Sequence, residues 1–187
     1  MTEQGEPTPS HEYFLELART LPKIDVNDPR VRAFVAADEE GRASIEIEIV
    51  NPVYNNYFLL FEARRLQATH PERVKGIEQV YLRTAEEIGE PWQRFLAENG
   101  ELLGEIDAAL EAREPFSDLF KYYRDLLRAR KFGEEDAIDD ATGHPLGISA
   151  IAVPLVDRLN PLLERASIAM QASGIDPQLY GLGREIN

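Results

Sequence analysis

The residues best suited to metal chemistry lie in one acidic segment between Gly133 and Gly147. The candidates are Asp136, Asp139, Asp140 and His144. Oxygen-rich clusters of this kind can hold Ca²⁺ or Mg²⁺. Their spacing does not match the EF-hand loop, which needs ligands at alternate positions around a glycine. Because runs of charge are usually solvated, we favour a solvated acidic loop and predict no cofactor.

A basic segment offers a second kind of chemistry, the docking of anions. Its cations Lys121, Arg124, Arg128 and Lys131 are spaced i, i+3, i+7 and i+10, which places them on one face of a helix. This face could dock an acidic partner or a short ligand that carries phosphate. The alternative is intramolecular, because residues 84–120 hold ten acidic side chains against two basic ones and could neutralise the stripe.

A short alternating segment at residues 44–50 is the best candidate for a recognition strand. Isoleucines alternate there with Glu46 and Glu48, which is the pattern of a strand with one apolar face. Val31, Ala33 and Val35 could form the returning strand of a hairpin. At a sheet edge, the unpaired amides would invite a partner strand while the glutamates oppose self-aggregation. The alternative is a hairpin folded against the rest of the chain, with its glutamates in water.

The sequence lacks the motifs of several large enzyme classes. It has no glycine-rich turn ending in Lys-Ser or Lys-Thr, no Gly-x-Ser-x-Gly and no Glu-x-x-His. We therefore predict no catalytic residue, and interpret His70 as a helix-boundary residue before Pro71.

The aromatic residues could line a small-molecule pocket, although their helical spacing is more typical of a core. They are Tyr54, Tyr57, Phe58, Phe61, Trp92, Phe95, Phe116, Phe120 and Tyr123.

The elements that would position these residues are mostly helical. Caps and apolar periods predict helices after Ser10, over 57–69, over 71–88, from Trp92 to Asn99, over 102–110, from Ser117 to Gly133 and from Asn160 to Gly174. The stretch 57–62 could instead be a third strand, and Pro154 should prevent an uninterrupted helix.

These elements predict a mainly α fold: an irregular bundle of five to seven helices with one N-terminal β-hairpin at 31–50. The alternative is an α+β fold with a three-stranded antiparallel meander. We expect a disordered lead over 1–10, a single helical domain over 11–174 and a C-terminal tail over 175–187.

Charge and composition exclude several kinds of partner. The 187 residues carry a net charge of −14, which repels nucleic-acid phosphates and anionic membrane surfaces. There is no cysteine, no stretch apolar enough to span a membrane and no signal-peptide pattern at the start. We therefore expect a cytoplasmic protein. The excess of arginine over lysine hints at a bacterial source.

Three functional hypotheses follow. The first is a non-enzymatic acidic protein that docks a protein partner, as an inhibitor, immunity factor, adaptor or assembly subunit. Acidic residues between Glu86 and Asp118, or between Glu134 and Asp140, would meet a basic partner. The second is a helical domain that binds a small molecule in an aromatic pocket. The third is a metal-dependent enzyme that uses the acidic loop.

Overall fold

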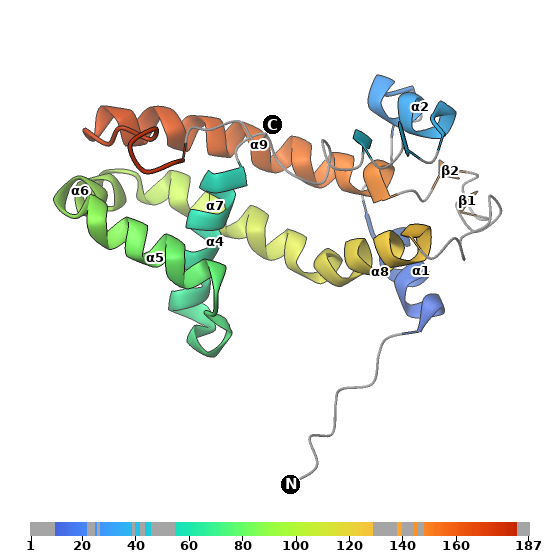
Figure 1. Cartoon of the computed structure of the whole chain (residues 1–187), viewed down its shortest axis with the longest axis horizontal. Coiled ribbons are helices and arrows are strands. Elements are labelled where there is room, and N and C mark those ends of the chain that lie inside the picture. The colour runs from blue at the N-terminus through green and yellow to red at the C-terminus, as the bar shows by residue number, and fades with distance from the viewer. Residues whose placement is uncertain are drawn as a thin grey trace, which may run out of the picture. The chain divides into compact units, whose positions relative to one another are not determined.

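The chain is mainly helical (Figure 1). The computed structural model describes residues 10–21, 25, 27–38, 40–41, 44–45, 55–128, 138–139, 144–145 and 148–182. The chain divides into two compact units. Unit 1 consists of Met1–Glu46 and Pro115–Pro154, and unit 2 consists of Ile47–Glu114 and Leu155–Asn187.

Unit 1 holds short helices and one minimal strand pair. The elements are α1 (His11–Arg19), α2 (Pro29–Ala36), α8 (Ser117–Arg128), β1 (Ile138–Asp139), β2 (His144–Pro145) and the first residues of α9 (Ile148–Ala172). As expected, the Ser10 side chain caps α1 by accepting a hydrogen bond from the Tyr13 amide over 3.2 Å. The Phe14 ring stacks on the Tyr122 ring of α8, with 4.2 Å between the ring centroids.

The predicted N-terminal hairpin is not found among the described residues. Its first strand, Val31–Val35, lies inside α2, and Ser44 and Ile45 of the second strand are helical. The Asp28 side chain caps α2 through the Arg30 amide, and Pro29 occupies the first helical turn. Val31 and Phe34 are buried at i and i+3, so the apolar residues follow a helical period. Glu46, Glu48 and the rest of 46–50 lie outside the described residues.

Unit 2 contains the longer helices. They are α4 (Asn55–Thr69), the 3₁₀ turn η1 (Pro71–Arg73), α5 (Ile77–Ile88), α6 (Glu90–Glu98), α7 (Gly100–Arg113) and the larger part of α9. A second 3₁₀ turn, η2 (Glu114–Phe116), follows α7 across the boundary between the units. The stretch 57–62 is helical, which confirms the helix and rejects the meander there. The expected helix over 71–88 is broken, because η1 ends at Arg73 and Gly76, at φ +49°, precedes α5.

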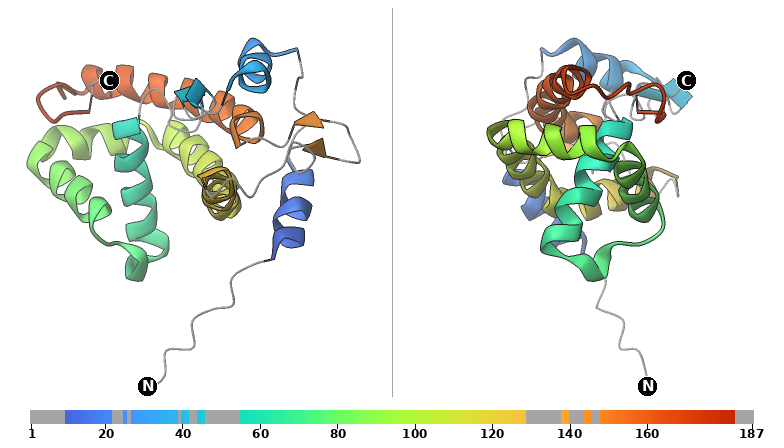
Figure 2. Two further views of the ribbon diagram at one scale, coloured as in Figure 1. Left: turned by 45° about the vertical axis from the view of Figure 1, so that its right-hand side comes forward. Right: turned by 90° about the vertical axis from the view of Figure 1, so that its left-hand side faces the viewer.

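Helix α4 is the central element of unit 2. Tyr57, Leu60, Phe61, Ala63 and Leu66 are all buried, and at about 100° per residue they cover more than half of the helix circumference. A helix with so wide an apolar face packs against neighbours on several sides, which explains the aromatic run at its start. Figure 2 shows α4 running alongside α5, and the Ser167 hydroxyl of α9 donates a hydrogen bond to the Tyr57 hydroxyl over 3.0 Å.

Helix α9 shows that the expectation of a helix break at Pro154 is wrong. It runs unbroken from Ile148 to Ala172 through both Pro154 and Pro161. A proline inside a helix costs about 3 kcal/mol because it lacks an amide proton and its ring crowds the preceding turn. Burial of Leu159, Leu163 and Met170 on the same helix offsets this cost.

The segment after α9 packs onto unit 2. Ile175 and Leu182 are buried, and the Asn56 amide group donates to the Gly181 carbonyl over 2.6 Å. The Tyr81 hydroxyl in turn donates to Asn56 Oδ1 over 2.9 Å. Residues 175–182 therefore cover the start of α4. In the described part of the chain, no helix is both long and apolar enough to cross a membrane.

Two glycines test this description of unit 2. Gly104 lies in the middle of α7, and open space surrounds the position of a Cβ there. We expect Gly104→Ala to raise the free energy of unfolding by about 1 kcal/mol, because alanine loses less backbone entropy in a helix. Gly174 has φ +88°, so Gly174→Ala should lower that free energy by about 1 kcal/mol or more. Urea unfolding followed by circular dichroism measures both, and changes of equal sign would contradict the assignment.

Candidate functional site

A pocket of about 200 Å³ lies between α4, α5 and α6 of unit 2. The residues that line it are Leu60, Arg64 and Gln67 from α4, Leu82, Ala85 and Glu86 from α5, and Trp92, Gln93 and Leu96 from α6. Five of the nine are apolar and form the walls. The exposed side chains of Gln67, Glu86 and Gln93 form its polar edge.

The turn between α5 and α6 places Trp92 in the pocket wall. Gly89 joins the two helices at φ +68°, a conformation that side-chain-bearing residues rarely adopt, and Pro91 follows in the first turn of α6. The Trp92 ring stacks on Phe95, with 5.4 Å between centroids, and lies 6.1 Å from the Phe61 ring of α4. Trp92 is the only tryptophan in the chain, so its fluorescence reports on this wall.

Arg64 supplies the cation of the pocket. Its Nη2 donates to Asp107 Oδ1 of α7, which neutralises much of its charge. Its Nε is buried and has no hydrogen-bond partner among the described residues. A buried donor without an acceptor costs about 1–3 kcal/mol, so native structures keep few of them.

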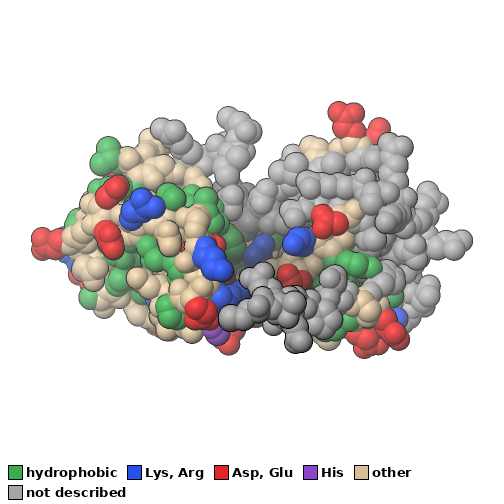
Figure 3. Space-filling view, turned by 60° about the horizontal axis from the view of Figure 1, so that its bottom comes forward, with side chains coloured by type: hydrophobic (Ala, Val, Ile, Leu, Met, Phe, Trp, Pro, Cys, Tyr) green, Lys and Arg blue, Asp and Glu red, His purple; other side chains and the backbone are tan. Residues whose placement is uncertain are grey.

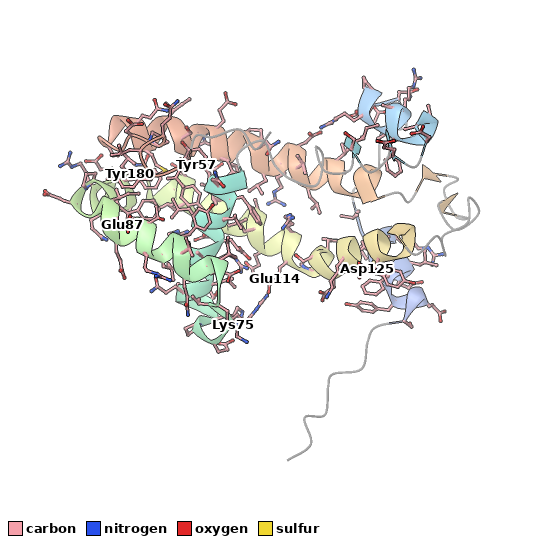
Figure 4. The ribbon with its side chains drawn as sticks, viewed as in Figure 1. Tyr57, Lys75, Glu87, Glu114, Asp125 and Tyr180 are labelled. Atoms are coloured by element: carbon pink, nitrogen blue, oxygen red, sulfur yellow. The ribbon has the colours of Figure 1, made fainter. Side chains whose placement is uncertain are left out.

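A second ionic network lies next to Arg64 along α4. Arg65 is 5% exposed, and its guanidinium donates to both oxygens of Glu62, over 2.9 and 3.0 Å, and to Glu114 over 3.0 Å. Arg73 of η1 donates to the other carboxylate oxygen of Glu114. Figure 4 labels Glu114. Glu62 thus binds Arg65 through both of its oxygens, and Glu114 bridges Arg65 and Arg73. A buried guanidinium needs such carboxylate partners to offset the cost of its desolvation.

The network perturbs the ionisation of its members. The hydrogen bond from Arg73, and that from Arg65, lower the pKa of Glu114 against the opposing effect of burial. Hydrogen bonds to Glu62 raise the pKa of Arg65. Burial lowers the pKa of Arg113, whose guanidinium lies 4.7 Å from the centroid of the Phe58 ring. These groups hold α4 to the end of α7.

The pocket lining favours binding over bond-making chemistry. It holds one carboxylate, one guanidinium and two primary amides, and none of its nine residues is a serine, threonine, lysine, histidine or tyrosine. Nucleophilic catalysis needs a nucleophile within hydrogen-bond reach of a base. What these nine residues can do is bury an apolar group and hydrogen-bond the atoms beside it.

The structure places only some of the predicted site residues. Lys121, Arg124 and Arg128 are all on α8 at the predicted spacing, and the Lys121 side chain is exposed. Asp139 and His144 are register partners across β1 and β2. Glu46, Glu48, Lys131, Asp136 and Asp140 lie outside the described residues. The part of the chain that is described holds no group of three or more His, Cys, Asp or Glu that could bind a metal.

Two of the nine pocket residues were candidates from the sequence: Trp92 as an aromatic that could line a pocket, and Glu86 at the start of the acidic stretch expected to meet a basic partner. The other seven were missed. Tyr57, Phe61 and Phe95 from the aromatic set are core residues with 1% exposure or less. The missed signal on α4 is the spacing of Leu60, Arg64 and Gln67 at i, i+4 and i+7, a stripe with one charge in a mostly apolar helix.

Comparison with known proteins adds no relative. No family model, no curated protein and no solved structure matches the chain.

The ionic network makes the stability of unit 2 sensitive to acid. A carboxyl whose pKa is lowered by folding stabilises the folded chain above its ordinary pKa, and this contribution is lost as the pH falls through the lowered value. We expect Glu114→Gln to lower the free energy of unfolding at pH 7 by about 2 kcal/mol. The loss is limited because Arg65 retains its hydrogen bonds to Glu62. The variant should lose less additional stability than the wild type between pH 7 and pH 3.

Urea unfolding at these two pH values measures the effect. Glu105→Gln serves as the control, because Glu105 also pairs with an arginine, Arg165 of α9, but on the exposed surface. It should change stability less than Glu114→Gln. Equal effects of the two substitutions, or an unchanged pH dependence for Glu114→Gln, would show that the network does not stabilise unit 2.

Proposed function

We propose that this chain is a non-enzymatic cytoplasmic interaction protein that docks a protein partner on the pocket of unit 2. The observation that carries the proposal is the size and lining of the pocket. Its volume of about 200 Å³ lies below the roughly 300–1,000 Å³ of sites that enclose drug-sized ligands. Protein interfaces, in contrast, concentrate their binding energy in small pockets that take single side chains.

The charge around the pocket supports a protein partner that is basic. Several carboxylates on α5–α7 and η2 are already paired: Glu105 with Arg165, Asp107 with Arg64, and Glu114 with two arginines. Other glutamates on these helices are exposed and have no ion pair among the described residues; they are Glu86, Glu87, Glu98 and Glu111. Figure 4 labels Glu87 on α5. Unpaired surface charge of one sign raises the association rate of an oppositely charged partner.

The surface of unit 2 also exposes apolar side chains. Ile77 and Val80 of α5 are about half exposed, at 51% and 50%. In the space-filling view, hydrophobic side chains lie between acidic and basic ones over unit 2, at the left (Figure 3). Neither Ile77 nor Val80 lines the pocket, so both belong to apolar surface elsewhere on unit 2.

Charge reversal at the pocket edge tests the proposal. The full chain, immobilised through its N-terminus, would capture its partner from a lysate of its own host at low salt, with mass-spectrometric identification. We expect Glu86→Lys/Glu87→Lys to weaken capture of that one protein by 10-fold or more, and 0.5 M salt to weaken it for the wild type.

The matched control is Glu164→Lys, which reverses an exposed charge on α9. It should leave capture unchanged. Capture that ignores both the charge reversal and the salt would contradict docking at this surface. A small-molecule mass on the bare chain in native mass spectrometry would favour the ligand-binding alternative instead.

A further inference from the structure

The pocket on α4, α5 and α6 has dimensions and charges that define what it receives. We propose that it takes one apolar side chain of phenylalanine or leucine size from the partner, and that a cationic side chain beside it in the partner meets Glu86. This inference rests on the proposed function and names the chemistry of the partner segment.

The apolar part follows from the walls. Leu60, Leu82, Ala85, Trp92 and Leu96 present aliphatic and aromatic surface. A cavity of about 150 Å³ with such a lining is large enough for benzene, so about 200 Å³ accommodates a phenyl or isobutyl group. A face of Trp92 in the wall also favours an aromatic guest.

The cationic part follows from the charges at the pocket edge. Arg64 contributes one positive charge, but its guanidinium is bonded to Asp107. Glu86 lines the pocket, is exposed and has no ion pair among the described residues. The nine lining residues carry one cation and one carboxylate, and only the carboxylate lacks an ion pair among the described residues. A cationic side chain of the partner can therefore pair with Glu86.

A peptide segment also supplies the partner that Glu86 lacks. A cation next to the inserted side chain can pair with this exposed carboxylate. An isolated apolar molecule would fill the walls but leave Glu86 without a partner.

Tryptophan fluorescence gives a direct test with the full chain, because Trp92 is its only tryptophan. The probes are three synthetic blocked pentapeptides of equal length. The first has a phenylalanine between two arginines, the second has alanine in place of that phenylalanine, and the third has glutamates in place of the arginines. We expect the first to bind about 10- to 100-fold more tightly than the second. It should also bind more tightly than the third, with a difference that salt reduces.

Two variants separate pocket binding from general attraction. Gln93→Phe places a ring at the pocket edge and should abolish the saturable fluorescence change with the first peptide. Gln171→Phe adds the same ring to an exposed site on α9 and should leave binding unchanged. Both positions are exposed, and thermal unfolding confirms that each variant is folded. Should Gln93→Phe fail to fold, Glu86→Lys must weaken the first peptide more than the third.

The outcomes distinguish this inference from the proposed function. Equal affinity for the phenylalanine and alanine peptides, or wild-type binding by folded Gln93→Phe, overturns the inference. Blocked phenylalanine amide that binds as tightly as the first peptide also overturns it, in favour of a small-molecule site. Partner capture that depends on Glu86 and Glu87 but not on Gln93 overturns only this inference. Capture that ignores all three residues overturns the proposed function as well.

Discussion

Unit 2 is constrained by a central helix that is buried over more than half of its circumference and still carries two consecutive arginines. Leu60 and Phe61 of α4 have no exposed surface, yet Arg64 and Arg65 follow within a turn. A guanidinium in such a place must be paired, because the desolvation of an unpaired charge costs several kcal/mol. Neighbouring helices therefore have to bring carboxylates to α4. Asp107 in the middle of α7 and Glu114 in η2, directly after α7, do so, and this fixes α7 against α4.

The pocket is a consequence of the same arrangement. Arg64 extends to Asp107, so its side chain borders the space between α4, α5 and α6 without filling it. Gly89 turns α6 back at the end of α5, which brings Trp92 to the opposite wall. The result is a hollow with apolar walls and charge only at its edge. Such a hollow suits a guest that is apolar at one end and polar at the other.

Sequence patterns predicted most helices because their caps and periods are local. They failed where a pattern fits two periods: Val31 and Val35 suit a strand, but the cap at Asp28 and burial of Val31 with Phe34 select a helix. They also failed at Pro154, where burial of the flanking residues outweighs the cost of a proline. The pocket could not be predicted from the sequence for another reason. Its residues come from three helices, and a local sequence pattern does not indicate which helix faces pack together.

Shape and charge would supply different parts of recognition in the proposed function. A net charge of −14 attracts cationic surfaces in general, so it raises encounter rates without selecting among basic proteins. Selection requires a site that binds one partner side chain more tightly than another, because the wrong side chain leaves unpaired polar groups or empty volume. The pocket has both properties, since a small side chain leaves its walls unfilled and an acidic neighbour is repelled by Glu86. In the proposed function, the charge of the whole chain supplies attraction and the pocket of unit 2 supplies selection.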